Sequence, residues 1–414
     1  MIIKEKEVKR MKILVSGGWG YGNLGDDALL VATIDLLKEK YPNSEIVIMS
    51  YDDIETQKLY ELSDIKVIPS VHRIISKKMA FNKLGTWGKS FNYFRLPHLI
   101  QRIISRFRYP YLINKEKEIY KTREQLLLDI QNSNIFKQFE TSDLFIMSGG
   151  GYFNSWLDSL SSRVIELKLA NKAKLKSLVI GQSIGPFITE DLNNTAFSGL
   201  KLASLISIRD KESYKELTDM GLSCSISPDL ALSNINFKPI KSKEISIVLG
   251  EFPKDKMSEL ANALILVSKT IECSFKLLLT RLYNADVVSV RNTHQILIRN
   301  GVKVNLIIPS SYEEVQKELA ESKVVVSRNL HGLILGWRAG VPSVCLNHER
   351  KFVTFMEQSK QSERLIGLQE FSKEKLSEAI LNAYKNEEDF SALKVEIAMS
   401  VKENFFNSID SLIS

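Results

Sequence analysis

Short runs of apolar residues alternate with amphipathic stretches along most of this chain, and the alternation predicts its architecture. The apolar runs have the continuous character expected for strands of a parallel sheet that is covered on both faces. Helical spacing follows most of them, so the pattern is typical of repeated β/α units. The predicted strands are Met11–Ser16, Glu45–Ser50, Asp143–Ser148, Leu178–Ile180, Leu205–Ile208, Ile245–Leu249, Phe275–Leu279, Val304–Ile308 and Val324–Val326.

The strands fall into two groups, separated by a polar, proline-containing segment at residues 233–243 that we interpret as a linker. A chain of 414 residues also exceeds what one ordinary hydrophobic core holds. The sequence therefore predicts an α/β protein with two Rossmann-like domains, 11–235 and 244–370, that face a cleft. A C-terminal helical segment, 371–414, is expected to brace the N-terminal domain, and residues 1–10 are expected to form a disordered leader.

The formal net charge of +7 is concentrated in one segment that interrupts this alternation. Residues 71–111 contain nine Lys and Arg, no Asp or Glu, and several aromatic residues. Basic and aromatic residues together suit an anionic membrane surface or a lipid diphosphate, so we predict a peripheral contact at the inner membrane face. The alternative is a solvated insertion whose aromatic residues pack on the domain. No nucleic-acid-binding module is recognisable, so no nucleic acid is predicted as a partner.

Cysteine usage and hydropathy indicate a cytoplasmic protein. Cys224, Cys273 and Cys345 lack the close spacing of a disulfide framework or a metal site. No run of eighteen apolar residues is present that would span a membrane. No His, Asp and Cys cluster has metal-ligand spacing, so we predict neither a metal nor another cofactor.

A glycine-rich turn, GGWGYGNLGDDAL, joins the first strand to the first helix. Gly20, Gly22 and Gly25 formally match the G-x-G-x-x-G fingerprint of dinucleotide-binding proteins. However, Asp26 and Asp27 place two negative charges at the helix N-terminus, where a pyrophosphate would have to bind. Either aspartate could instead bind a sugar hydroxyl or remove its proton. The alternative is that both only stabilise the end of the helix.

A second glycine-rich turn, SGGGYFN, follows the strand at Asp143–Ser148. Three glycines at the carboxyl end of a strand let a ligand approach the backbone closely, at the edge where open α/β sheets bind ligands. Further along, Arg209 stands at a strand end before a helix and is a candidate anion ligand. A salt bridge with Asp210 or Glu212 is the alternative role for this arginine.

Arg328 and His331 stand three residues apart where the strand Val324–Val326 gives way to a short helix. A helix N-terminus already favours an anion, and a guanidinium adds a planar, permanently charged fork. His331 is the titratable group there that can give or take a proton near neutral pH. The pattern predicts an anion site with its own proton donor. The alternative is that Arg328 pairs with a surface carboxylate and His331 caps the helix.

Five motifs occur in one order along the chain: GYGNLGDDAL, SGGGYFN, GQSIGPF, SIRDKES with SPDLAL, and SRNLHGLILGWRAGVPSV followed by RKF. In this set and order the chain resembles the polysaccharide pyruvyl transferase family, from about Met11 to Phe355 apart from the basic insertion. The resemblance implies a two-domain fold of the glycosyltransferase B type. It also implies transfer of a pyruvyl group from phosphoenolpyruvate to hydroxyls of a sugar in a cell-surface polysaccharide precursor, which forms a ketal and releases phosphate. A lipid-diphosphate-linked acceptor would fit the basic insertion.

By matched motif, the resemblance implies that Arg328 and His331 bind and protonate the donor. Arg209 would hold the donor phosphate or carboxylate, and Asp26 would serve the acceptor. Family members usually place Leu directly between Arg and His, whereas this chain has Asn329 and Leu330 there, which could rotate Arg328 relative to His331. The other candidate substrate-binding residues are Asn23, Asp27, Gly150, Gly151, Asn154 and Lys351.

Two other functions remain open from the sequence. A nucleotide-sugar-dependent glycosyltransferase would share the two-domain fold. Retaining enzymes of that kind often carry a ribose-binding carboxylate shortly before a Gly-x-Pro turn, where this chain has Leu335, Gly336 and Trp337. A non-catalytic, membrane-associated partner would depend on residues 71–111 and not on the cleft residues. Fold analogy alone does not choose among the three.

Overall fold

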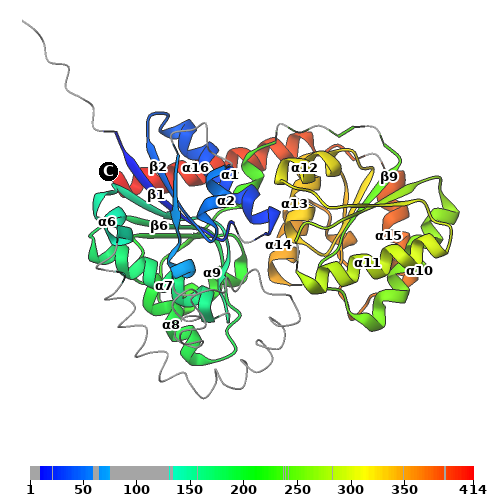
Figure 1. Cartoon of the computed structure of the whole chain (residues 1–414), viewed down its shortest axis with the longest axis horizontal. Helices are drawn as coiled ribbons and strands as arrows, with labels where there is room; N and C mark the ends of the chain where they lie inside the picture. Colours follow the sequence, from blue (N-terminus) through cyan, green and yellow to red (C-terminus); the bar gives the residue numbers. More distant parts are fainter. Residues whose placement is uncertain are drawn as a thin grey trace, which may run out of the picture.

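The computed structural model describes residues 10–414 except 21, 59–64, 75–129, 131–133, 156, 236, 238, 241, 282, 348 and 387. The described chain forms two lobes, each built around one parallel sheet (Figure 1). The predicted leader, apart from Arg10, and the basic insertion beyond Ile74 lie outside the described residues. The membrane contact expected of that insertion therefore stays a prediction.

β1 (Lys12–Ser16) lies in the middle of the first sheet, between β2 (Glu45–Ser50) and β4 (Leu144–Met147). The strand order is β3-β2-β1-β4-β6-β7-β8, with β5 paired to β6 beside this path. The order of strands reverses next to β1, and open α/β sheets bind ligands at such a reversal. The remaining strands are β3 (Lys66–Pro69), β5 (Gly150–Phe153), β6 (Ser177–Ile184), β7 (Leu205–Ile208) and β8 (Ser225–Ile226).

β9 (Glu244–Val248) has the corresponding place in the second sheet, between β10 (Ser274–Leu278) and β12 (Val324–Ser327). The order is β11-β10-β9-β12-β13, with β11 (Val304–Ile307) and β13 (Ser343–Cys345) at the edges. All described pairings in both sheets are parallel. The predicted pair of Rossmann-like domains is therefore confirmed.

Helices cover both faces of each sheet. On the first sheet, α1, η3 and α16 share one core with the strands, while α6, α7 and α8 share the core on the other face. On the second sheet, α10, α11 and α15 cover one face and α12 and α13 the other. The described helices are α1 (Leu24–Lys40), α2 (Asp53–Lys58), α6 (Asn134–Thr141), α7 (Leu157–Lys172), α8 (Glu190–Leu200), α9 (Lys211–Asp219), η3 (Leu230–Ser233), η4 (Lys254–Lys256), α10 (Met257–Thr270), α11 (Asn284–Arg299), α12 (Tyr312–Ala320), α13 (Leu330–Arg338), α14 (Arg350–Gln358), η5 (Ser362–Arg364), α15 (Lys373–Lys385) and α16 (Ser391–Ile413).

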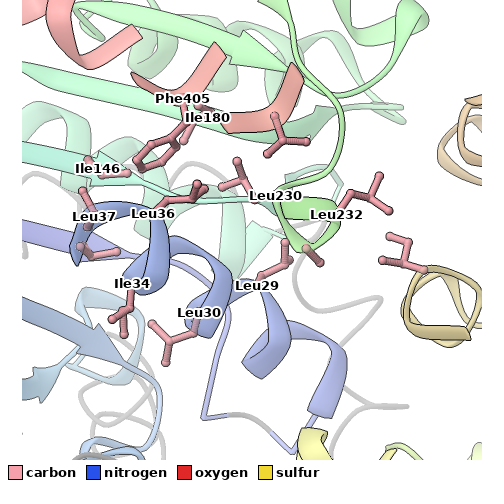
Figure 2. Packing of buried hydrophobic residues seen from close by; sticks show 14 of the residues in the cluster. Leu29, Leu30, Ile34, Leu36, Leu37, Ile146, Ile180, Leu230, Leu232 and Phe405 are labelled. Atoms are coloured by element: carbon pink, nitrogen blue, oxygen red, sulfur yellow. The ribbon is translucent and has the colours of Figure 1, made fainter. Parts of the chain in front are cut away.

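The apolar side of α1 anchors the first of these cores. Its side chains face Ile146 of β4, Ile180 of β6 and Phe405 of α16 (Figure 2), and all of them are buried. Because strands and helices so far apart in the sequence share this core, the first turn of α1 has a fixed position. The α1 residues labelled in Figure 2 are Leu29, Leu30, Ile34, Leu36 and Leu37.

The two C-terminal helices pack on different domains. α16 runs along the first sheet, with Val401 and Phe405 in its core and Asp410 paired to Lys40 of α1 at 2.7 Å. α15 instead buries Leu376 and Ile380 in the core of the second sheet, against α10. The expectation that all of 371–414 braces the N-terminal domain is thus wrong for α15, because this helix packs on α10, β12 and β13 of the second domain.

α13 is buried on every side, with all nine of its residues inside the protein. A helix that is apolar all round needs neighbours all round, and α13 contacts its own sheet, α12, α14, α1 and η3. Two glycines allow its close approach to the sheet. A Cβ at Gly332 would lie 2.6 Å from Ser327 Oγ, and one at Gly336 2.8 Å from Val325. The N-terminus of α13 is consequently held against the first domain.

The two domains contact each other at two places. Asn23 forms a β-bridge with Arg281, and the Leu24 amide donates to the Thr280 carbonyl at 3.3 Å. Two ion pairs join α9 to α14: Arg350 with Glu216, and Lys211 with Glu357 at 3.0 Å. Among the helices that the structure describes, none is long and apolar enough to cross a membrane.

Candidate active site

The first turn of α1 presents Asn23 and Asp26 as one unit. The Asn23 side chain caps the helix by accepting a hydrogen bond from the Gly25 amide at 3.3 Å. Its amide nitrogen donates to Asp26 Oδ2 at 2.8 Å. Capping residues commonly use one side-chain oxygen in this way. The structure thus gives Asn23, predicted as a substrate ligand, the task of orienting the Asp26 carboxylate.

Desolvation, and after it the charge of the neighbouring Asp27, raise the pKa of Asp26 to about 7. Asn23, Tyr152 and Arg209 act in the opposite direction. A carboxyl group whose pKa lies near neutrality can both accept and return a proton at physiological pH. The environment of Asp26 therefore suits the role of acceptor-side base that the sequence predicts.

An Asp26→Asn variant should be more stable than the parent at alkaline pH and lose this advantage in acid. The folded chain holds the Asp26 proton up to about pH 7, whereas the unfolded chain releases it near pH 3.8. Stability contributed by Asp26 therefore falls as the pH rises through this window. At about 1.4 kcal/mol per pH unit, we expect a relative gain of about 2–4 kcal/mol between pH 4 and pH 8.

Urea unfolding at both pH values measures this difference. Asp191→Asn, an exposed first-turn position of α8, is the matched control for a lost helix-end charge. A stability difference between Asp26→Asn and the parent that stays constant with pH would show that Asp26 ionises like an exposed carboxyl.

Asp27 faces a different set of groups. Its Oδ1 accepts a hydrogen bond from the Gly20 amide at 3.3 Å. Burial raises the pKa of Asp27 to about 6. The charge of Glu313 on α12 contributes to this rise, and the hydrogen bond from Gly20 opposes it. Asp27 thus holds the glycine-rich turn in place, and Asp26 is the aspartate of the two that Arg209 and Tyr152 influence.

The SGGGYFN turn brings backbone close to Arg209. A Cβ at Gly151 would lie 3.9 Å from Arg209 Nη2, and Gly150 has a φ of 146°, which favours glycine. The Asn154 amide donates to the Gly151 carbonyl and so closes the turn. Gly150 and Gly151 therefore shape the site through the backbone, while Asn154, predicted to bind substrate, supports them.

Arg209 is buried in an ion pair that fixes its direction. Its Nη1 donates to Asp229 Oδ2 at 2.6 Å, and its Nε donates to Ser183 Oγ at 2.9 Å. The sequence suggested Asp210 or Glu212 as the alternative partner. Asp210 instead caps α9 by accepting from the Ser213 amide at 2.8 Å. A guanidinium held on two sides offers its remaining N–H groups in a defined direction.

His331 lies on the domain boundary, against the first turn of α1. A Cβ at Gly25 would lie 2.2 Å from His331 Nδ1, so the imidazole packs directly on this glycine. His331 Nε2 is buried without a hydrogen-bond partner among the described residues. The cap of α13 is Asn329, whose side chain accepts from the His331 amide at 3.1 Å. The alternative that the His331 side chain caps this helix is therefore wrong.

The pKa of His331 is lowered to about 4, first by burial and then by nearby cations. Asp229 opposes this shift, while Arg209, Lys351 and Arg281 contribute to it. The expectation that His331 titrates near neutrality is therefore wrong for the protein without a ligand, because the sequence does not reveal this burial. The free protein holds a neutral imidazole at pH 7.

Arg328 points toward the end of β9. Its Nη1 donates to the Glu251 carbonyl, and its guanidinium lies 5.6 Å from the centre of the Phe252 ring. Glu349, Glu251 and Arg281 are its main charged neighbours. Arg328 thus contacts its own domain, whereas His331 contacts α1, in keeping with the extra residue between them.

Arg281 is a site residue that the sequence reasoning missed. Its Nε pairs with Asp286 at 2.8 Å, and its charge acts on both Arg328 and His331. Arg281 lies after the carboxyl end of β10, as Arg328 lies after that of β12. A basic residue shortly after a predicted strand is thus the sequence signal for it. Asp229 and Tyr152 were missed as well, although both lie within motifs that the sequence singled out.

Lys351 completes the set of cations around His331. It lies in the first turn of α14, pairs with Glu349 at 3.2 Å and is partly exposed. With Arg209, Arg281 and Arg328 it surrounds the α13 N-terminus from four different segments. Among the described residues no three His, Cys, Asp or Glu side chains gather as metal ligands. The expectation of no metal and no cofactor stays a prediction.

Solved structures with the same fold include sugar-nucleotide enzymes. The UDP-N-acetylglucosamine 2-epimerase of Neisseria meningitidis bound to UDP-GlcNAc matches with a TM-score of 0.57 at 12% identity, covering 97% of this chain and 100% of that one. A putative epimerase of the same kind from Listeria monocytogenes has a TM-score of 0.57 at 13% identity, covering 97% and 96%. The Anabaena protein Alr3699/HepE in complex with UDP and glucose has a TM-score of 0.54 at 12% identity, covering 96% and 95%.

These structural matches show the fold, which is the two-domain glycosyltransferase B type that the sequence predicted. No curated protein sequence matches the chain. The family model of polysaccharide pyruvyl transferases matches residues 23–350. The match covers most of the chain and includes every predicted site residue except Lys351, which follows directly. The chain is a transferase and belongs to the polysaccharide pyruvyl transferase family.

Proposed function

We propose that this protein transfers a pyruvyl group from phosphoenolpyruvate to hydroxyls of a saccharide in a cell-surface polysaccharide precursor. The observation that carries the proposal is the placement of His331 on the domain boundary. Three cations, Arg209, Lys351 and Arg281, act on its pKa, and Gly25 in the first turn of α1, next to Asp26, packs directly against it. A donor anion on the α13 side would thereby meet an acceptor hydroxyl on the α1 side. The family match supports the same reaction.

The donor is a small, multiply charged anion, and its charge explains the cations. Arg209, Arg281, Arg328 and Lys351 each have a carboxylate neighbour in the described structure. A phosphate or carboxylate of the donor would replace part of these contacts with stronger, bidentate ones. Fixed cations also stabilise the charge that develops as phosphate leaves.

The reaction would proceed by one addition and one displacement at C2 of the donor. Protonation of its methylene carbon, C3, by the protonated His331 makes a methyl group and leaves a cation-like centre at C2. A sugar hydroxyl attacks C2, and its proton passes to the Asp26 carboxylate. Attack by a second hydroxyl breaks the bond between C2 and the phosphate oxygen, and the phosphate carries away the second proton. The products are a cyclic ketal and inorganic phosphate.

Phosphoenolpyruvate should raise the melting temperature of the protein, because a ligand that binds only the native state stabilises it. Arg328→Lys should weaken this effect, since a point charge does not replace a guanidinium fork. Arg299→Lys is the matched control, because Arg299 is exposed at the end of α11, on the opposite edge of the sheet. Thermal-shift titrations of the three proteins measure the effect.

The same titration tests the alternative of a nucleotide-sugar-dependent glycosyltransferase, which the fold of the UDP-bound structures favours. UDP- and GDP-sugars should leave the melting temperature unchanged. Stabilisation by a nucleotide sugar and not by phosphoenolpyruvate would overturn the pyruvyl transfer proposal. A lipid-diphosphate carrier for the acceptor remains part of the proposal through the basic residues 71–111.

A further inference from the structure

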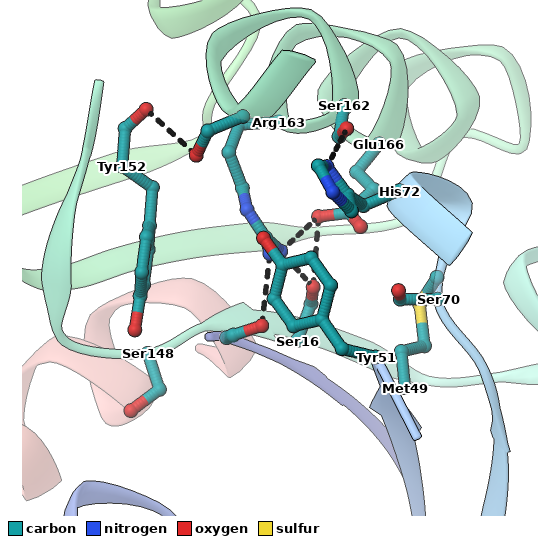
Figure 3. Close-up of polar contacts among 12 residues, drawn as sticks. Ser16, Met49, Tyr51, Ser70, His72, Ser148, Tyr152, Ser162, Arg163 and Glu166 are labelled. Carbon is teal, nitrogen blue, oxygen red and sulfur yellow. Dashed lines mark hydrogen bonds and ion pairs between the residues drawn. The ribbon is translucent and has the colours of Figure 1, made fainter. Parts of the chain in front are cut away.

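A buried ion pair lies behind the glycine-rich turns, on the side of the first sheet that faces α7 (Figure 3). Arg163 and Glu166 are both fully buried and pair at 2.7 Å. Glu166 also accepts a hydrogen bond from Ser16 Oγ at 2.8 Å. Taking two charges out of water is expensive, and hydrophobic residues often replace such pairs without loss of stability. The pair therefore calls for a role besides stability.

Arg163 reaches from α7 to both glycine-rich turns. Its Nη2 donates to the Gly17 carbonyl at 2.8 Å and to the Tyr51 hydroxyl at 3.2 Å. Its guanidinium lies 5.8 Å from the centre of the Tyr51 ring and 5.1 Å from that of Tyr152. Figure 3 shows Arg163 between the two rings. One buried cation thus fixes the first glycine turn and the tyrosine of the second.

The hydroxyl group of Tyr152 is buried at the other end of its ring. A Cβ at Gly18 would lie 2.0 Å from Tyr152 Oη, so glycine at this position gives the hydroxyl its space. The hydroxyl completes no hydrogen bond among the described residues, and the Tyr152 side chain lowers the pKa of the Asp26 carboxyl. Burial and then Asp26 raise the pKa of Tyr152 itself well above 10, so it keeps its proton.

We propose that Tyr152 is a positioning residue whose hydroxyl holds the Asp26 carboxylate that takes the acceptor proton, and that Arg163 fixes the Tyr152 ring for this task. The inference rests on the proposed function, in which Asp26 is the acceptor-side base. A neutral hydroxyl beside a half-buried carboxylate can donate to its ionised form. In this arrangement the donor anion and Arg209 lie on one side of Asp26. Tyr152, which Arg163 holds in place, lies on another side.

The groups that face Asp26 come from three elements. Asp27 raises its pKa from α1 itself; Asn23 at the start of α1, Tyr152 from β5 and Arg209 after β7 lower it. Without the Tyr152 hydroxyl, burial and Asp27 are opposed by fewer groups, so the pKa of Asp26 should rise. Arg163 is not among the main groups that act on Asp26 directly. Any effect of an Arg163 substitution on Asp26 should therefore pass through Tyr152.

The titration of Asp26 provides a test that needs neither substrate. Its midpoint is obtained from the pH dependence of urea stability, comparing each protein with its own Asp26→Asn counterpart. Tyr152→Phe should move this midpoint upward by about one pH unit, the size of effect expected for one hydrogen bond to a carboxylate. Tyr214→Phe, at an exposed position on α9, is the matched control and should leave the midpoint unchanged.

Arg163→Lys should produce a smaller shift in the same direction, because lysine keeps the charge but loses the planar guanidinium that lies against the Tyr152 ring. In the Tyr152→Phe background Arg163→Lys should add nothing, which a double-mutant cycle detects. This conservative variant also keeps Glu166 paired, so it avoids leaving a charge buried alone. An additive effect of the two substitutions would overturn the role given to Arg163.

An unchanged Asp26 midpoint in Tyr152→Phe would overturn the role given to Tyr152. Phosphoenolpyruvate should stabilise Tyr152→Phe as it does the parent, because the hydroxyl faces the acceptor side. If phosphoenolpyruvate raises the melting temperature of the parent but not that of Tyr152→Phe, then Tyr152 belongs to the donor side and the inference is overturned. If phosphoenolpyruvate fails to stabilise the parent, the proposed function fails, and the Asp26 titration still decides whether Tyr152 and Arg163 position this carboxylate.

Discussion

Replacing His331 with asparagine is expected to lower turnover by about two to four orders of magnitude, the usual contribution of a positioned general acid. Binding of phosphoenolpyruvate should largely persist, since in the proposed site Arg209, Arg281 and Arg328 would carry the charge that holds it. Phosphate release from phosphoenolpyruvate, with a saccharide acceptor fraction, measures turnover. His294→Asn on α11 is the matched control and should match the parent.

The mechanism requires that His331 gain its proton when the donor binds. Its pKa of about 4 results from burial and from cations that the donor would neutralise. A bound anion of several charges should therefore raise the pKa of His331 toward neutrality. Calorimetric titration in two buffers with different ionisation enthalpies should detect more proton uptake with the parent than with His331→Asn. This result separates a proton donor from a residue that merely fills space.

A His331→Asn protein that melts earlier but releases phosphate at the parental rate would remove the histidine from the mechanism. The cations would then form only an anion site, and another group would supply the proton. The imidazole packs against Gly25, so some loss of stability is expected in any case. Turnover and proton uptake, measured together, therefore decide the role of His331.

Most of the strands and the interior helices are predictable from the sequence because their burial follows from local pattern, whereas β3, β5 and β8 have no continuous buried apolar run and were not predicted. β12 and α13 are apolar at nearly every position, and a segment of that kind has no stable place on a surface. α15 and α16 are harder, because both are amphipathic and the sequence does not say which core each one fills. Their opposite assignments, α15 to the second sheet and α16 to the first, depend on contacts far apart along the chain.

The site shows the same limit at the level of single side chains. The residue types of Arg209, Asp26 and His331, at strand ends and a helix start, indicate a polar site. Their partners and ionisation are not local: Arg209 pairs with Asp229 and not with adjacent Asp210, and His331 is buried by Gly25 of the other domain. A sequence predicts which groups gather at a sheet edge more readily than it predicts what surrounds them.

Gly25→Ala should lower both the stability and the turnover of the protein, although it replaces a glycine in a helix. Alanine in the first turn of α1 would by itself favour the helix by up to about 1 kcal/mol. Its Cβ would, however, lie 2.2 Å from His331 Nδ1 and 2.5 Å from His331 Cβ, so the imidazole or the whole boundary must move. Overpacking of this kind typically costs about 1–3 kcal/mol. A misplaced acid should also reduce turnover about 100-fold.

Restoring the space tests this explanation directly. His331→Gly added to Gly25→Ala should recover most of the stability measured by urea unfolding, because both the ring and the Cβ that clash are gone, but it should not recover turnover. Gly22→Ala is the matched control in the same turn: a φ of 78° makes alanine strained there, while no atom lies within 4 Å of its Cβ. His331→Gly should therefore not rescue Gly22→Ala. If Gly25→Ala is as stable and as active as the parent, the first turn of α1 does not meet His331 in the working enzyme, and the acceptor and donor sides need another point of contact.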